Sequence, residues 1–518
     1  MAEILRGGAG ARASVVGILS PVADHIGLPV DKVNFLTCQF LALLLSYPLR
    51  SVLSPLKTSS NARLAYELFV GLFLCTFCFG YQIIHLIILS TTCLLILKYY
   101  PGRHYRHLIV FAFAMLYLAV THIHRQVYDY GGYTMDISGP LMVMVQRVTS
   151  FSFSVHDGTI PDEKLSAVQK QRAVRTFPSV LTYYSYLMFF QAIMCGPFVF
   201  YDDYMGFIHG SKGPKKPSLP ATLQQQNGVD SHGSVPEQTE PAPGGVVARK
   251  LLVSVVCGLV TLALAPSYPA ESLTRPSFNE MSFIGKLWHM HVVLLMARMK
   301  YYFAWTMAEA VCHNAGLGFN GYDSSGKQRW DLIDNVDIKQ VELSTNLKAL
   351  IDAWNMGTAK WLRFIVYDRL TKWRTTAVLC VSSVWHGFYP GYYLMFINGG
   401  ILGITARKMR HHFRWYFQTS KSKRVFYDIV TFIVTRMAIA YIASSFILLE
   451  ITPSLATFRS VYFWGHVVSL PPFLLLSGRK HPQKPTSNHA QMTKNHTQTI
   501  TTNHAQQTTP VPDDKKSL

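Results

Sequence analysis

Long apolar stretches alternate with short polar segments along most of this chain. Each stretch is close to the length of about 20 residues that a helix needs to cross about 30 Å of hydrocarbon. The pattern predicts an all-α, polytopic membrane protein with about eleven transmembrane or membrane-embedded helices. We expect these helices near residues 33–49, 65–80, 82–98, 107–123, 134–150, 178–200, 250–266, 284–310, 375–406, 425–449 and 457–477.

Changes in composition divide the chain into five predicted segments. They are an N-terminal segment (1–30), a first transmembrane half (31–207), a disordered linker (208–249), a second transmembrane half (250–478) and a disordered tail (479–518). The linker and the tail are low in apolar residues and biased toward a few polar types, so neither can bury a core. The N-terminal segment lacks the long apolar run of a cleaved signal peptide, and we expect the first spanning helix to direct membrane insertion.

The charge balance also fits a membrane protein. The chain carries 48 Lys and Arg against 28 Asp and Glu, a net charge of +20, although 49% of its residues are hydrophobic and only 15% are charged. The cations collect between the apolar stretches, as in cytosolic loops that face anionic lipid, and not on one face with a nucleic-acid-binding motif. We therefore expect membrane lipid as a partner and no nucleic acid.

Positive charge predicts the orientation of the C-terminal part. Residues 407–424 contain seven Lys or Arg and no acidic residue. The positive-inside rule places this loop in the cytosol, and two further helices return the tail to the same side. The chain ends in Lys515-Lys516-Ser517-Leu518, which resembles the dilysine retrieval signal of endoplasmic-reticulum proteins. We predict a multi-pass endoplasmic-reticulum membrane protein with a cytosolic C-terminus; chance lysines in the tail are the alternative.

Two pairs of potential metal ligands do not form a convincing site. Cys75 and Cys78 have a zinc-type spacing but lack a second pair of ligands, and they lie in an apolar stretch. His122 and His124 alternate within one predicted helix, so their side chains point to different faces. We expect both histidines to lie at the membrane interface and no metal to be bound.

One histidine stands inside the longest uncharged stretch. Residues 375–406 contain no Asp, Glu, Lys or Arg, and they include His386. An ionisable side chain within the membrane is a functional hypothesis because burying it is costly; a hydrogen-bonded core histidine is the alternative. At 1.5 Å per residue a straight helix of 32 residues would be about 48 Å long, so we expect a break or a protruding end.

The sequence around this histidine resembles a known family. Trp385-His386-Gly387, with Asn355 placed 31 positions upstream, resembles the signature of the membrane-bound O-acyltransferase (MBOAT) family. Further segments resemble its lysophospholipid acyltransferase branch, and the resemblance covers most of residues 31–470. These segments are 129–133 (DYGGY), 136–140 (DISGP), 156–158 (HDG), 300–305 (KYYFAW), 318–322 (GFNGY) and 329–331 (RWD).

The resemblance implies an acyl-CoA-dependent O-acyltransferase. Such an enzyme would transfer a fatty acyl chain, with an unsaturated, oleoyl-like chain favoured, to the free hydroxyl of a lysophospholipid. Lysophosphatidylserine and lysophosphatidylethanolamine are the favoured acceptors. His386 would act as general base and Asn355 would stabilise the oxyanion or orient the acceptor, with acyl-CoA as co-substrate and no bound cofactor. A sterol, a diacylglycerol or a protein is an alternative acceptor, and a transporter is an alternative of another class.

Six further residues are candidates for substrate binding. Aromatic side chains surround the histidine, a carboxylate lies within an apolar helix, and two cations lie on a basic segment: Trp385, Tyr389, Tyr392, Glu309, Lys360 and Arg363. Glu309 is four positions from His313, so the two share a helix face, where they either line a cavity or tie neighbouring helices together. The two cations either meet the phosphates of coenzyme A or anchor the protein to anionic lipid.

Overall fold

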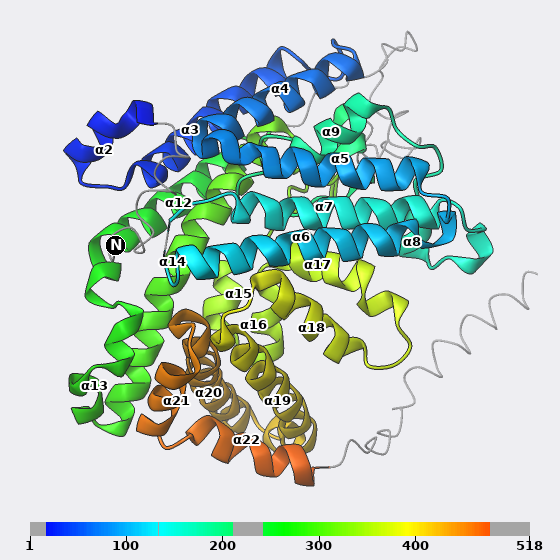
Figure 1. The fold of residues 1–518 in the computed structure, drawn as a ribbon. Coiled ribbons are helices and arrows are strands. Elements are labelled where there is room, and N and C mark those ends of the chain that lie inside the picture. The colour runs from blue at the N-terminus through cyan, green and yellow to red at the C-terminus, as the bar shows by residue number, and fades with distance from the viewer. Residues whose placement is uncertain (1–16, 133, 211–241, 477–518) are drawn as a thin grey trace, which may run out of the picture. The chain divides into compact units, whose positions relative to one another are not determined.

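The described part of the chain is helical, which confirms the all-α prediction. The computed structural model describes residues 17–132, 134–210 and 242–476. Within these ranges the regular elements are helices. One isolated β-bridge pairs Tyr322 with Gln328. The described residues up to Phe473 pack as one unit (Figure 1).

The first helices form one packed group. In Figure 1, α5, α6 and α7 lie side by side, and each contacts the other two. The elements are η1 (Gly17–Leu19), α2 (Ser20–Ile26), α3 (Val30–Ser51), α4 (Ser60–Phe79), η2 (Gly80–Ile83), α5 (Ile84–Tyr99), η3 (Arg103–Tyr105), α6 (Arg106–Tyr128), α7 (Ser138–Asp157), η4 (Asp162–Lys164), α8 (Ala167–Arg172), α9 (Val180–Met188) and α10 (Tyr201–His209).

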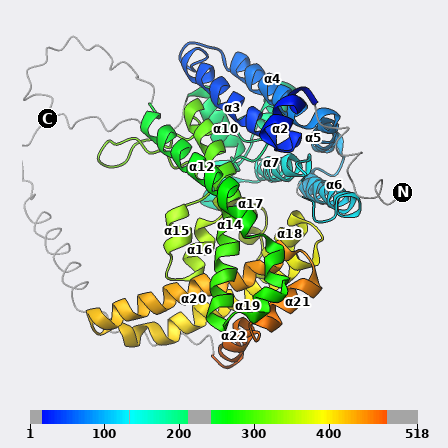
Figure 2. The same ribbon diagram turned by 90° about the vertical axis from the view of Figure 1, so that its left-hand side faces the viewer.

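The later helices are organised around α14, which has 33 residues and is therefore about 50 Å long at 1.5 Å per residue. It contacts α3 of the first group as well as α12 and α20, and its course can be followed in Figure 2. The elements are α12 (Gly244–Leu264), η5 (Ala265–Ser267), η6 (Ala270–Thr274), α13 (Pro276–Glu280), α14 (Phe283–Ala315), α15 (Ile338–Leu343), α16 (Leu347–Ala353), α17 (Met356–Ile365), η7 (Tyr367–Arg369), α18 (Arg374–His386), α19 (Pro390–Phe413), η8 (Arg414–Gln418), α20 (Lys421–Leu448), α21 (Ile451–Ser460) and α22 (Trp464–Leu475).

Several helical segments are long and apolar enough to cross a membrane. They are Val30–Ser51, Ser60–Tyr99, Arg103–Tyr128, Gly244–Thr274 and Lys421–Leu448. Side chains on their outer faces remain exposed, for example Phe69 (71%) and Leu116 (64%), as expected of surfaces that meet lipid. The chain is therefore a polytopic helical protein, and the larger number of about eleven embedded helices stays a prediction.

Two expected helices differ from the structure, and a third is broken as expected. The stretch 178–200 is helical only to Met188, where the backbone of Phe189 becomes non-helical with φ −53° and ψ 129°. The stretch 457–477 is divided between α21 and α22 by residues with positive φ, Tyr462 (54°) and Phe463 (50°). The stretch 375–406 is broken between α18 and α19, as its length predicted.

Only some of the predicted segments fall within the residues that the structure describes. Residues 211–241 of the expected linker, residues 1–16 of the N-terminal segment and the whole expected tail lie outside the described residues. At the two described ends of the linker, α10 continues to His209 and α12 begins at Gly244. The linker predicted for 208–249 is therefore helical at both of these ends.

Charged side chains inside the helical unit are paired across distant segments. Arg369 makes a bidentate contact with the fully buried Asp157, at 2.8 and 2.7 Å. Arg298 binds Glu342 in the same way, at 2.8 and 2.9 Å. A buried charge is tolerated when it is paired and hydrogen-bonded, and these pairs also fix which helices lie next to one another.

Gly71 in α4 allows a close approach that a larger residue would prevent. A Cβ atom added there would lie 1.9 Å from the carbonyl oxygen of Met188 at the end of α9. We predict that Gly71→Ala lowers the melting temperature of the purified protein, with a loss on the order of 1–3 kcal/mol, because two backbones must separate. Gly245→Ala is the matched control, since nothing lies within 4 Å of that position. Equal melting temperatures for the two variants would contradict the close packing of α4 on α9.

Candidate active site

His386 is the last residue of α18, at the point where the expected long helix breaks. Gly387 has φ +120°, a conformation that L side chains rarely adopt, and a Cβ atom there would lie 3.3 Å from Cγ of His122. The next helix, α19, starts with Pro390 in its first turn, where proline is favoured. The glycine and the proline together end one helix and begin the next beside the histidine.

The ring of His386 is held with one nitrogen available. Its Nδ1 atom lies 2.7 Å from the carbonyl oxygen of Ser382. A carbonyl accepts only, so Nδ1 carries the proton and Nε2 of the neutral ring keeps its lone pair. Within the described part of the chain, no hydrogen bond reaches Nε2 of His386. The ring therefore presents a proton acceptor.

Aromatic side chains from two later helices surround this ring. The ring centroid of His386 lies 5.2 Å from that of Phe396, 5.6 Å from that of Phe446 and 6.3 Å from that of Tyr392. Tyr392 and Phe446 also stack on each other at 4.3 Å. The proton acceptor thus lies against apolar walls supplied by α19 and α20.

His122 fixes the other side of the break, and its expected position at the membrane interface stays a prediction. It is buried at 9% exposure, and its Nε2 lies 3.0 Å from the carbonyl oxygen of Trp385. A helix that ends inside a protein leaves carbonyl groups without partners, and His122 supplies one such partner. The neighbouring His124 is exposed, so the two histidines do face different ways.

Trp385 and Tyr389 are bound to the first helical group. The indole Nε1 of Trp385 donates to the carbonyl oxygen of Met142 at 3.1 Å. The hydroxyl of Tyr389 accepts a hydrogen bond from the amide of Gly131 at 3.0 Å. Of the three predicted aromatic residues, these two hold the break in place, while Tyr392 lies against the His386 ring.

Asn355 lies in a second irregular segment, between α16 and α17. Its backbone is left-handed, with φ 47° and ψ 52°, and its side chain makes no cap hydrogen bond. It is half-buried, and the ring of Trp354 before it lies 4.9 Å from that of Trp305. Although α17 contacts α18, no hydrogen bond joins Asn355 to His386 among the described residues.

Asn335, which the sequence did not single out, holds the segment around Asn355. Its carbonyl oxygen accepts from the amide of Met356 at 2.7 Å, and its side-chain oxygen accepts from the amide of Gly357 at 3.0 Å. These two bonds satisfy amides in the first turn of α17 that have no partner within the helix. A buried asparagine 20 positions upstream is a weak sequence signal, so only the structure identifies it.

Glu309 supports Asn335 in turn. Its side chain is fully buried, and one carboxylate oxygen accepts from the amide of Asn335 at 2.7 Å and from that of Val336 at 3.3 Å. The other oxygen forms an ion pair with Lys250, which also binds Asp334 at 2.9 Å. Both carboxylate oxygens are thus bound within the chain, which matches the alternative of a group that ties helices together.

Lys360 and Arg363 lie on the exposed side of α17. Arg363 binds Asp368 at 3.3 Å, and the amine of Lys360 lies 3.5 Å from the carbonyl oxygen of Leu332. Neither is joined to His386 by a hydrogen bond in the described part of the chain. Among the same residues, no group of three or more His, Cys, Asp or Glu is placed to hold a metal ion.

The left-handed backbone of Asn355 gives a prediction about stability. Asparagine and glycine tolerate positive φ better than alanine does. We expect Asn355→Gly to keep a melting temperature at or above that of Asn355→Ala, with a difference on the order of 1 kcal/mol. Thermal unfolding of the two purified variants checks this. If Asn355→Ala were the more stable protein, the assigned backbone conformation would be contradicted.

Comparison with known proteins places this site in a family. The chain matches the MBOAT, membrane-bound O-acyltransferase family over residues 123–449, a range that includes both Asn355 and His386.

Several curated relatives resemble nearly the whole chain. It is 41% identical over 458 residues to lysophospholipid acyltransferase 6 of Drosophila melanogaster; the match covers 88% of this chain but 62% of that longer relative. It is 40% identical over 480 residues to membrane-bound glycerophospholipid O-acyltransferase 2 of Rattus norvegicus, covering 92% of this chain and 90% of the relative. A lysophospholipid acyltransferase of Schizosaccharomyces pombe is 30% identical over 465 residues, 86% of each chain. The chain therefore belongs to the membrane-bound O-acyltransferase family.

Proposed function

We propose that this protein is a lysophospholipid acyltransferase that moves a fatty acyl chain from acyl-CoA to the free hydroxyl of a lysophospholipid. Membership of the family and the names of the relatives support this reaction class. The observation that carries the proposal is the state of His386: Nδ1 is engaged by the Ser382 carbonyl, while Nε2 has no hydrogen-bond partner among the described residues. Removal of the proton of an acceptor hydroxyl requires such a proton acceptor.

The proposed chemistry is a direct transfer within a ternary complex. Nε2 of His386 removes the proton of the acceptor hydroxyl as that oxygen attacks the thioester carbonyl carbon. The tetrahedral intermediate then collapses, the carbon–sulfur bond breaks, and the proton passes from the imidazolium to the sulfur of coenzyme A. The products are a diacyl phospholipid and free coenzyme A, and a thioester needs no further cofactor for this step.

Asn355 is the proposed second catalytic residue. Its side chain forms no capping hydrogen bond. The amide can therefore donate a hydrogen bond to the developing oxyanion or orient the acceptor. A donor of this kind is typically worth ~3 kcal/mol of transition-state stabilisation. Asn335 and Glu309 then act as positioning residues, because they hold the backbone on which Asn355 stands.

The substrates follow from the family branch and from the surroundings of the site. We propose lysophosphatidylserine or lysophosphatidylethanolamine as acceptor and an oleoyl-like donor. The apolar walls formed by Tyr392, Phe396 and Phe446 suit an acyl chain beside His386. Lys360 and Arg363 are exposed, where they are available to coenzyme A phosphates. A sterol, a diacylglycerol or a protein is the alternative acceptor.

Turnover in detergent micelles separates this enzyme from a transporter. We expect the purified protein, without any sealed compartment, to convert lysophosphatidylserine or lysophosphatidylethanolamine and oleoyl-CoA to diacyl lipid and free coenzyme A. Mass spectrometry of the lipid and a thiol assay measure the two products independently. Well-folded protein that releases coenzyme A without diacyl lipid, or that is inactive across a broad lysolipid panel, would contradict the proposal.

We further propose that the protein resides in the endoplasmic-reticulum membrane with its C-terminus in the cytosol. The basic residues of 407–424 and the C-terminal Lys515 and Lys516 support this placement. A C-terminal tag should be digested when protease is added to intact microsomes, and Lys515→Ser/Lys516→Ser should increase escape to later compartments. A tag that is protected from the protease would overturn the orientation. An unchanged distribution of the double variant among the cell's compartments would contradict a retrieval role for the two lysines.

A further inference from the structure

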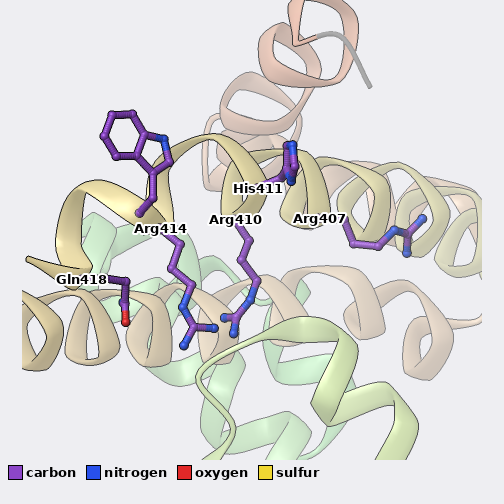
Figure 3. A pocket seen from close by; sticks show the side chains of 6 residues that line it. Arg407, Arg410, His411, Arg414 and Gln418 are labelled. Carbon is purple, nitrogen blue, oxygen red and sulfur yellow. The ribbon is translucent and has the colours of Figure 1, made fainter. Parts of the chain in front are cut away.

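A basic hollow lies at the end of α19, where η8 connects it to α20. It is open, has a volume of about 450 Å³, and is lined by Arg407, Arg410, His411, Arg414, Trp415 and Gln418 (Figure 3). Since α20, Lys421–Leu448, is long and apolar enough to span a membrane, the hollow lies beside the end of a spanning segment. A hollow beside the end of such a segment is expected to lie near the border between hydrocarbon and water.

The arginines of this hollow have no acidic partner. Arg407, Arg410 and Arg414 form no ion pair or side-chain hydrogen bond with any residue that the structure describes, and residues 407–424 contain no acid. Lys408, by contrast, donates to the carbonyl oxygen of Phe473 at 2.6 Å. In Figure 3 the guanidinium groups of Arg410 and Arg414 extend in the same direction and lie near each other. Like charges four positions apart repel, and a bound anion would relieve the repulsion.

A neutral donor adds to this positive charge. The side-chain nitrogen of Gln418 is buried and has no hydrogen-bond partner. A buried polar group without a partner is costly and calls for a ligand atom or water to satisfy it. Arginines that supply paired N–H groups, together with an amide donor, match the several acceptor oxygens of a phosphate group.

Aromatic residues beside the hollow favour a lipid over a soluble anion. The rings of Trp415 and Tyr416 stack at 3.6 Å, yet the residues remain 49% and 53% exposed. Tryptophan and tyrosine of this kind are enriched at membrane interfaces. A second open hollow of about 450 Å³ follows, lined by Tyr416, Phe417, Ser422, Lys423 and Phe426, and it offers apolar surface next to the start of α20.

We propose that the hollow formed by Arg407, Arg410, Arg414 and Gln418 binds the phosphate-bearing headgroup of an anionic phospholipid from the surrounding leaflet. The guanidinium groups and the Gln418 amide hold the phosphate, and the exposed aromatic residues rest in the interfacial layer. This site is separate from His386, so the inference does not depend on the proposed acyl transfer.

Native mass spectrometry of the full-length protein in detergent micelles tests the site, with dioleoyl phosphatidic acid as probe and dioleoyl phosphatidylcholine as reference lipid. We expect Arg410→Gln/Arg414→Gln to weaken phosphatidic acid binding about ten-fold or more, since each cation near a membrane surface contributes several-fold, without changing phosphatidylcholine binding. The matched control is Lys421→Gln/Arg424→Gln, which removes two nearby cations outside the lining and should change binding less than about three-fold. Equal losses in both double variants, or no loss in either, would overturn the proposal.

Two measurements on the unaltered protein keep the test independent of variant folding. A photoactivatable phosphatidic acid should crosslink to the peptide 407–418, and crosslinks confined to other peptides would overturn the proposal. Inorganic phosphate and coenzyme A at millimolar concentration should leave the bound lipid in place. Displacement by either would instead identify a site for a soluble anion.

Discussion

A broken helix within a membrane must supply partners for the backbone groups that the break exposes, because hydrocarbon offers none. Both candidate catalytic residues lie beside irregular backbone between two helices. At the first, the carbonyl oxygen of Trp385 is bound by His122 and the hydroxyl of Tyr389 binds the amide of Gly131. At the second, Asn335 accepts hydrogen bonds from the amides at the start of α17. The irregular backbone is therefore enclosed by protein, and it presents His386 and Asn355 on rigid supports.

The same constraint explains why much of the buried polarity is structural. Glu309 is a fully buried carboxylate, yet both of its oxygens are engaged within the chain, one by backbone amides and the other by Lys250. The imidazole of His386 differs, since only one of its nitrogens is engaged. The other nitrogen of His386, which lies beside apolar side chains, can therefore form a hydrogen bond with a substrate. This contrast ranks His386 above Glu309 as a candidate catalytic group.

The sequence predicted what depends on local pattern and missed what depends on long-range contact. The helical class of the fold followed from the apolar stretches, and the break in 375–406 followed from the length of that stretch. Asn355 and His386 were found through a family resemblance, since nothing local relates positions 31 apart. The hydrogen bond of His122 was not predicted, because helix periodicity cannot reveal a carbonyl 263 positions away in the sequence. The end of α9 at Met188 was missed because hydrophobicity persists where the helix does not.

The central claim, that His386 is the base, is tested most directly by turnover per folded molecule in His386→Ala. The account predicts a loss of about 10²- to 10⁴-fold with the melting temperature and acyl-CoA binding largely retained. Addition of Asn355→Gly, which spares the left-handed backbone, should then lower the rate little further, because residues that act as a unit are not additive. A folded His386→Ala protein that keeps more than about a tenth of the wild-type rate falls short of the loss expected for a general base and would contradict the account.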